Sequence, residues 1–140
     1  MDSELKREII MEHYQNPINR KIINDESYEK VNTANESCID NIDMYILIKD
    51  NVIKDICFDG EACAISISST SIMIKNLIGK SVKEAKDYIN NFINMVNEKN
   101  YDKDILNEAY VYEDIYKQSS RKTCATLPYR GILKVLENYE

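Results

Sequence analysis

Apolar residues recur at helical spacing near the start of the chain. Leu5, Ile9, Ile10 and Tyr14 fall on one face of a helix over residues 4–14. Proline disfavours helical geometry in the residue before it, so Pro17 should end this segment. The pattern predicts an amphipathic helix of about three turns.

The next apolar positions follow a period of two, which is typical of strands. Residues 41–50 alternate apolar and polar side chains, and residues 51–60 form a second short apolar run after the turn residues Asp50 and Asn51. These two runs predict an antiparallel hairpin. Residues 28–35 are expected to add a third strand.

The segment over residues 64–79 could be a strand or a helix. Ile65 and Ile67 alternate as in a strand, but the length of the segment and its end at Gly79 suit a helix. We therefore expect a helix that begins near Cys63.

Three more helices are expected in the second half of the chain. Ser81 and Glu84 have capping-box spacing and begin a helix that runs to about Asn97. A weaker helix is expected over residues 102–117, and a last one over residues 123–138, entered or bent at Pro128. A small antiparallel sheet of about three strands followed by helices is an α+β fold.

The length and charge of the chain limit the number of domains and the classes of function to be expected. A chain of 140 residues predicts a single domain over residues 1–140. Its formal net charge of -6 argues against a general nucleic-acid binder. The charged N-terminus lacks a signal peptide's apolar core, and no apolar run could span a membrane, so we expect a cytoplasmic protein.

The four cysteines differ in their settings. A reducing cytosol disfavours disulfides and leaves metal binding, reactivity or burial. Cys57 lies inside an apolar strand and is expected to be a core residue. Cys38, Cys63 and Cys124 lie at the ends of expected elements, where functional residues are often placed. Helix N-termini lower thiol pKa values, so Cys63 and Cys124 are candidate thiolates.

Two further residues are candidate ligands. Asp40 follows Cys38 by two positions, and together they offer the carboxylate and thiolate donors that a zinc or iron site can combine. His13 is the only histidine, and a packing role is favoured over metal binding. No CxxC pair is present, so spacing alone leaves the presence of a metal open.

Four blocks of sequence carry a resemblance to a known family. They read IIMEHYQNP at residues 9–17, CID at 38–40, DGEACAISISSTS at 59–71 and RKTCATL at 121–127. In this order they resemble the U-type iron-sulfur cluster assembly proteins, the IscU and NifU N-terminal family. The long gap between the last two cysteines and the form of the last block resemble the SufU branch.

The resemblance implies an α+β domain with a metal site at one exposed end. Zn²⁺ would be held by Cys38, Asp40, Cys63 and Cys124. Cys38 would accept persulfide sulfur from a cysteine desulfurase of SufS or IscS type. Arg121 would orient Asp40 or contact the partner, and a downstream iron-sulfur carrier or scaffold is a further expected partner.

The resemblance also implies alternatives. Cys38, Cys63 and Cys124 could hold a [2Fe-2S] cluster on an assembly scaffold. A zinc-stabilised paralogue that binds the desulfurase without accepting sulfur is another alternative, because Ile39 replaces the family's usual glycine and Thr123 replaces the lysine common in the SufU branch. If the loop needs a positive φ, Ile39 would strain it.

Overall fold

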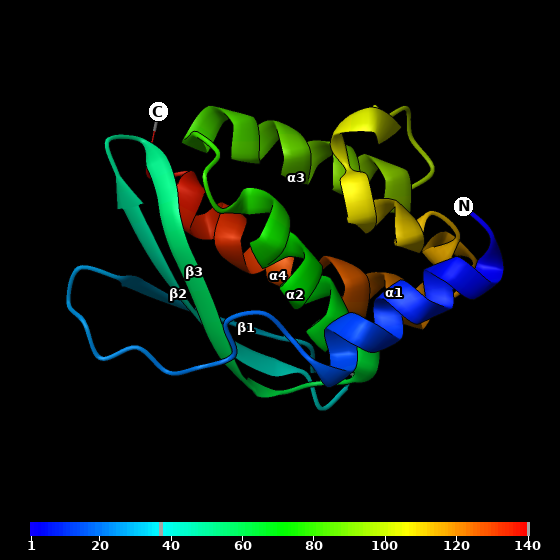
Figure 1. Cartoon of the computed structure of the whole chain (residues 1–140), viewed down its shortest axis with the longest axis horizontal. Helices are drawn as coiled ribbons and strands as arrows, with labels where there is room; N and C mark the ends of the chain where they lie inside the picture. Colours follow the sequence, from blue (N-terminus) through cyan, green and yellow to red (C-terminus); the bar gives the residue numbers. More distant parts are fainter. Residues whose placement is uncertain (37, 140) are drawn as a thin grey trace.

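An antiparallel sheet carries the helices on one of its faces (Figure 1). The computed structural model describes residues 1–36 and 38–139. The strand order is β1-β2-β3. The predicted α+β fold is confirmed, with these bounds: α1 Ser3–Gln15, β1 Glu29–Ala34, β2 Asn41–Lys49, β3 Val52–Glu61, α2 Ala64–Leu77, α3 Val82–Val96 and α4 Ser119–Leu136.

The β2–β3 hairpin forms the middle and one edge of the sheet. Its two turn residues, Asp50 and Asn51, both have positive φ values, of 55° and 58°. This geometry matches the right-handed twist of the strands and suits Asp and Asn. Met44 pairs with Phe58 on the face that packs against the helices. The predicted hairpin and the expected strand β1 are both confirmed.

The segment after α1 covers the free edge of β3. The main-chain N–H of Lys21 donates to the carbonyl of Phe58, and the N–H of Phe58 donates to the carbonyl of Asn19. An exposed strand edge can pair with another chain, so these bonds protect β3 from such pairing.

Helix α2 lies at the centre of the helical layer. The helical interpretation of residues 64–79 is therefore correct, and the strand alternative is wrong. From Ser66 to Ile74 every side chain of α2 is buried. The helix packs against α1 and α4, which explains why it lacks the one-sided apolar pattern of a surface helix.

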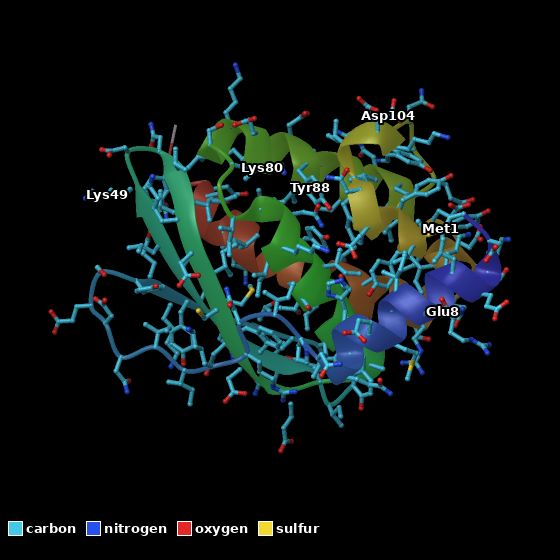
Figure 2. All side chains as sticks on the ribbon, in the orientation of Figure 1. Met1, Glu8, Lys49, Lys80, Tyr88 and Asp104 are labelled. Atoms are coloured by element: carbon cyan, nitrogen blue, oxygen red, sulfur yellow. The ribbon has the colours of Figure 1, made fainter. Side chains whose placement is uncertain are left out.

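Helix α3 shows the predicted capping box between Ser81 and Glu84. The ring of Phe92 stacks on that of Tyr129 from α4, with centroids 4.0 Å apart. Figure 2 shows side chains filling the space between the sheet and the helices. None of the helices among the described residues is long and apolar enough to cross a membrane.

The predicted helix over residues 102–117 is wrong. Three short 3-10 segments take its place: Lys103–Ile105, Asn107–Tyr112 and Ile115–Lys117. Asn107 has a φ of 51°, which interrupts a right-handed helix. The carbonyl of Leu106 accepts hydrogen bonds from the N–H of Ala109 and the hydroxyl of Tyr88. The bond from Tyr88 of α3 to this carbonyl is thus made in place of a continuous α-helix.

The last helix begins earlier than predicted. Helix α4 starts at Ser119, so the alternative in which the helix is entered at Pro128 is wrong, and Pro128 lies inside it. Proline has no N–H, which leaves the carbonyl of Cys124 without its usual donor four residues later. The hydroxyl oxygen of Ser66 lies 3.1 Å from this carbonyl oxygen, and Ser69 donates to the next carbonyl, that of Ala125, at 2.6 Å. Hydroxyl groups of α2 thus lie against the carbonyls at this turn of α4, and Ser69 supplies a donor there.

Replacing Gly60 by alanine should disturb the sheet next to the β1–β2 loop. Gly60 has a φ of +141°, and an added Cβ would lie 2.2 Å from the carbonyl oxygen of Asn41. Strain and overlap together should lower the free energy of unfolding by about 3 kcal/mol or more. Urea denaturation measures the change.

Gly79→Ala is the matched control. Gly79 has a φ of +93° but no atom within 4 Å of the added Cβ, so only backbone strain applies. We expect a loss of about 1–2 kcal/mol. An equal loss in the two variants would contradict the predicted overlap at Asn41.

Candidate metal centre

Four side chains from three separate places in the chain meet at one end of the sheet. Cys38 and Asp40 lie in the loop between β1 and β2, Cys63 is the N-cap of α2, and Cys124 lies in the second turn of α4. Their potential ligand atoms all lie within 4.8 Å of one another. The fold thus brings together all four residues that the resemblance had singled out.

Asp40 is held by the first turn of α2. One carboxylate oxygen accepts the N–H of Cys63 at 2.7 Å, and the other accepts the hydroxyl of Ser66 at 2.5 Å. Burial alone would raise the pKa of Asp40, but hydrogen bonds from Ser66, Cys63 and Cys124 together lower it below its ordinary value. The carboxylate is therefore kept ionised although only 2% of the residue is exposed.

Cys124 differs from its predicted setting. The prediction placed it at a helix start with a lowered thiol pKa, but α4 begins five residues before it. Burial, and then the neighbouring Asp40 and Cys63, raise the pKa of the Cys124 thiol to about 12. The prediction of a readily formed Cys124 thiolate is wrong for the chain without metal.

The chemistry of the four donors fits Zn²⁺. Three thiols and one carboxylate make a closed set of four ligands, as in structural zinc sites. Donor atoms around tetrahedral zinc are separated by about 3.5–3.8 Å. The 4.8 Å limit observed here is wider by about 1 Å, which small side-chain rotations can close.

The loop residues Cys38 and Ile39 face solvent. Cys38 is exposed, and Ile39 is exposed to 68%. The described non-glycine residues with positive φ are Asn19, Asp50, Asn51, Glu98 and Asn107. Ile39 is not among them, so the strain that would follow from replacing a glycine does not arise.

Arg121 lines the same hollow as Cys38 and Cys124. Its side chain is exposed and forms no ion pair with Asp40 in the described part of the chain. The hydrogen bonds that orient Asp40 come from Cys63 and Ser66 instead. The role of Arg121 stays a prediction.

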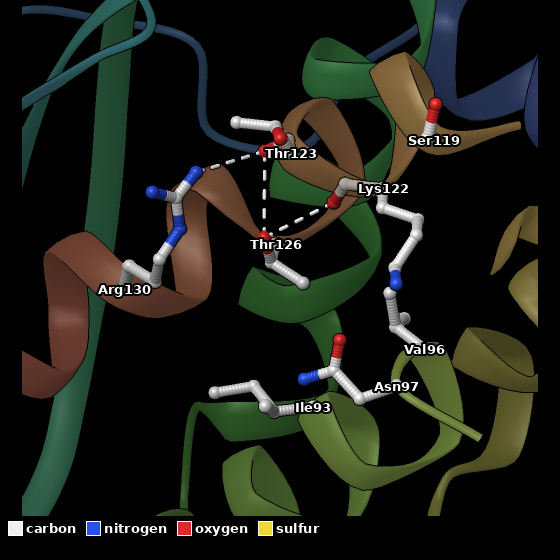
Figure 3. A pocket seen from close by; sticks show the side chains of 8 residues that line it. All are labelled: Ile93, Val96, Asn97, Ser119, Lys122, Thr123, Thr126 and Arg130. Atoms are coloured by element: carbon white, nitrogen blue, oxygen red, sulfur yellow. Dashed lines mark hydrogen bonds between the residues drawn. The ribbon is translucent and has the colours of Figure 1, made fainter.

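A second hollow lies between the end of α3 and the first turns of α4 (Figure 3). Thr123 lines both hollows, and its main-chain carbonyl accepts a hydrogen bond from Arg130 at 2.9 Å. Lys122 and Arg130 both line the second hollow. The cation that lines the hollow of Cys124 is Arg121, whereas Lys122 and Arg130 face the second hollow.

Two other candidates have structural roles. His13 is buried, with Nδ1 2.7 Å from the Ser71 hydroxyl and Nε2 3.1 Å from the Glu108 carboxylate. It joins α1 to the core, which is the packing role that the sequence favoured. Cys57 is fully buried in β3 and outside the cluster, also as predicted.

Sequence reasoning missed Ser66. Its fully buried hydroxyl lies 3.6 Å from the sulfur of Cys63 as well as 2.5 Å from Asp40. The available signal was its place three residues after the N-cap of the helix.

The sequence pattern of the family described as NifU-like N terminal domain matches residues 5–125. The chain belongs to this family. Similar individual proteins agree with this match. A zinc-dependent sulfurtransferase SufU from Bacillus subtilis is 33% identical over 93% of this chain and 88% of its own.

Scaffold proteins of iron-sulfur cluster assembly are similar too. An iron-sulfur cluster assembly scaffold protein IscU from Thermotoga maritima is 32% identical over 74% of this chain and 72% of its own. A crystal structure of a SufU described as an assembly scaffold for the SUF system, from Fervidobacterium islandicum, superimposes with a TM-score of 0.84. It is 32% identical and covers 92% of this chain and 94% of its own. The predicted resemblance to this family and its SufU proteins is confirmed.

The thiols of this NifU-like domain should react with iodoacetamide at different rates in the absence of metal. Cys38 is exposed, whereas Cys57 and Cys124 are buried and have thiol pKa values raised to about 11 and about 12. At pH 8 these raised pKa values leave about one thiolate in 10³ or 10⁴. We expect Cys38 to be modified at least about tenfold faster, as measured by peptide mass spectrometry.

The same reaction in guanidinium chloride is the control, because unfolding removes the differences in burial. All four cysteines should then react at similar rates. Equal labelling of Cys38 and Cys124 in the folded chain would contradict the arrangement described here.

Proposed function

We propose that this chain serves iron-sulfur cluster biogenesis as a zinc-binding sulfurtransferase that accepts persulfide sulfur from a cysteine desulfurase. The observation that carries the proposal is the convergence of Cys38, Asp40, Cys63 and Cys124 at one end of the fold. Similarity to the zinc-dependent sulfurtransferase SufU over 93% of the chain supports it. The protein would act as one domain over residues 1–140, in the cytoplasm, where thiols stay reduced.

The metal would be held by Cys38, Asp40, Cys63 and Cys124. Bound Zn²⁺ would keep the thiols deprotonated at neutral pH. This contribution matters most at Cys124, whose burial otherwise favours the protonated thiol. The buried carboxylate of Asp40, already fixed at both oxygens, would need little rearrangement to take part.

Cys38 would be the sulfur acceptor, because it is the exposed thiol of the cluster. Its thiolate would attack the terminal sulfur of the desulfurase persulfide. A new bond forms between the Cys38 sulfur and that terminal sulfur, the sulfur-sulfur bond of the desulfurase breaks, and its electron pair leaves on the desulfurase thiolate. No external oxidant or reductant is consumed.

Arg121 would contact the partner and not Asp40. Its exposed guanidinium lines the hollow next to Cys38, whereas both oxygens of Asp40 are already bonded to groups of α2. A cation at this position would favour the approach of an anionic persulfide or of carboxylates on a desulfurase of SufS or IscS type. The sulfur would then pass to a downstream iron-sulfur carrier or scaffold.

A second candidate is a scaffold for [2Fe-2S] cluster assembly and transfer. Similarity to the IscU of Thermotoga maritima over 74% of the chain favours it. The same thiolates, from Cys38, Cys63 and Cys124, would ligate the cluster. A metal analysis separates the two functions.

Protein purified anaerobically without added metal should contain about one zinc per chain and no acid-labile sulfide. Atomic emission spectroscopy and a sulfide assay measure the two quantities. Iron with a matching amount of sulfide would instead support the scaffold. A chain with neither metal would contradict both functions.

Cys38→Ala should abolish transfer of radiolabelled sulfur from the desulfurase, because the acceptor thiol is lost. The label on the chain should fall at least about tenfold. Cys57→Ala is the matched control, since it removes a buried thiol outside the cluster and should retain the label. Undiminished labelling of the Cys38 variant would exclude Cys38 as the acceptor.

A further inference from the structure

Ser66 occupies the third position of α2 and contacts three of the four cluster residues. Its hydroxyl oxygen lies 2.5 Å from a carboxylate oxygen of Asp40, 3.1 Å from the main-chain carbonyl of Cys124 and 3.6 Å from the sulfur of Cys63. The residue is fully buried. Water therefore cannot replace the hydroxyl as a partner of these groups.

The single hydroxyl proton of Ser66 has to be assigned to one acceptor. Asp40 offers a charged oxygen at the shorter distance, and the Cys124 carbonyl is neutral and farther away. Hydrogen bonds to charged acceptors are shorter and stronger than neutral ones. Ser66 therefore donates its hydroxyl proton to the carboxylate of Asp40.

Ser66 and Cys63 hold the two oxygens of the same carboxylate. The N–H of Cys63 takes one oxygen of Asp40 and the Ser66 hydroxyl takes the other. Two bonds to one rigid helix turn fix both the position and the rotation of the carboxyl group. The thiols of Cys63 and Cys124 also donate to Asp40, but thiols that a metal has ionised cannot donate. Without Ser66 the carboxylate would then keep only the N–H bond from Cys63 and could rotate away.

We propose that Ser66 is a positioning residue that holds the Asp40 carboxylate toward the thiols of the metal centre. The inference rests on the proposed function, because it assigns Asp40 to the ligand set. Partners that orient metal ligands in this way commonly change metal affinity by about 10- to 100-fold. Ser66 itself is not a ligand.

Ser69 provides a matched control on the same helix. Its hydroxyl is fully buried and donates to the Ala125 carbonyl of α4 at 2.6 Å. Ala125, which accepts this bond, does not belong to the cluster. Ser69→Ala thus removes a buried hydroxyl bond between α2 and a neighbour while leaving Asp40 untouched.

The test compares zinc affinity in the wild-type chain and in Ser66→Ala, Ser66→Thr and Ser69→Ala. Competition with a chromophoric chelator gives the zinc dissociation constant, and urea denaturation of the metal-free proteins gives their stability. Ser66→Ala should weaken zinc binding by about 10- to 100-fold. Ser66→Thr keeps the hydroxyl and should restore most of the affinity, although its extra methyl group lowers stability.

Ser69→Ala should lose stability but bind zinc within about threefold of the wild-type chain, because its lost bond lies outside the cluster. Equal zinc affinity of Ser66→Ala and Ser69→Ala, with a wild-type chain that binds zinc, would show that Ser66 is only structural. A wild-type chain that fails to bind zinc would overturn the proposed function, and this inference with it.

Discussion

Helix α2 is buried along most of its length, yet it is rich in hydroxyl side chains, and each buried hydroxyl needs a hydrogen-bond partner. These partners lie on different neighbours of the helix. Ser66 binds Asp40 in the β1–β2 loop, Ser68 lies 2.5 Å from the hydroxyl of Tyr112, Ser69 binds the Ala125 carbonyl of α4, and Ser71 lies 2.7 Å from His13 of α1. The hydrogen bonds that these hydroxyls require thus orient the neighbouring elements relative to α2.

The candidate metal centre follows from the same constraint. Cys63 is the N-cap of α2, and the first turn of this helix holds both oxygens of Asp40. Pro128 frees the Cys124 carbonyl, which lies within 3.1 Å of the Ser66 hydroxyl. The loop that carries Cys38 and the helix that carries Cys124 are therefore aligned against one turn of α2.

The charge around the centre differs from that of the chain as a whole. The net charge is -6, but α4 carries Arg121, Lys122, Arg130 and Lys134 and no acidic residue. Arg121 lines the hollow of Cys38 and Cys124, and Lys122 lines the second hollow. A cluster of three thiols and a carboxylate is thus placed beside a helix whose charged residues are all basic.

The sequence by itself determined the strands, the first helix, the capped helix α3 and the four cluster residues, because spacing and caps are local and the motif blocks are specific. It failed where contacts distant in sequence prevail. Around Leu106, 3-10 turns replace the expected helix, and the Leu106 carbonyl accepts a bond from the Tyr88 hydroxyl. Helix α4 runs through Pro128 at the turn where hydroxyls of α2 lie against its carbonyls. Only the tertiary structure decides which groups are buried and which meet. Burial raised the thiol pKa of Cys124, and the packing of the β1–β2 loop on α2 brought Asp40 to Ser66.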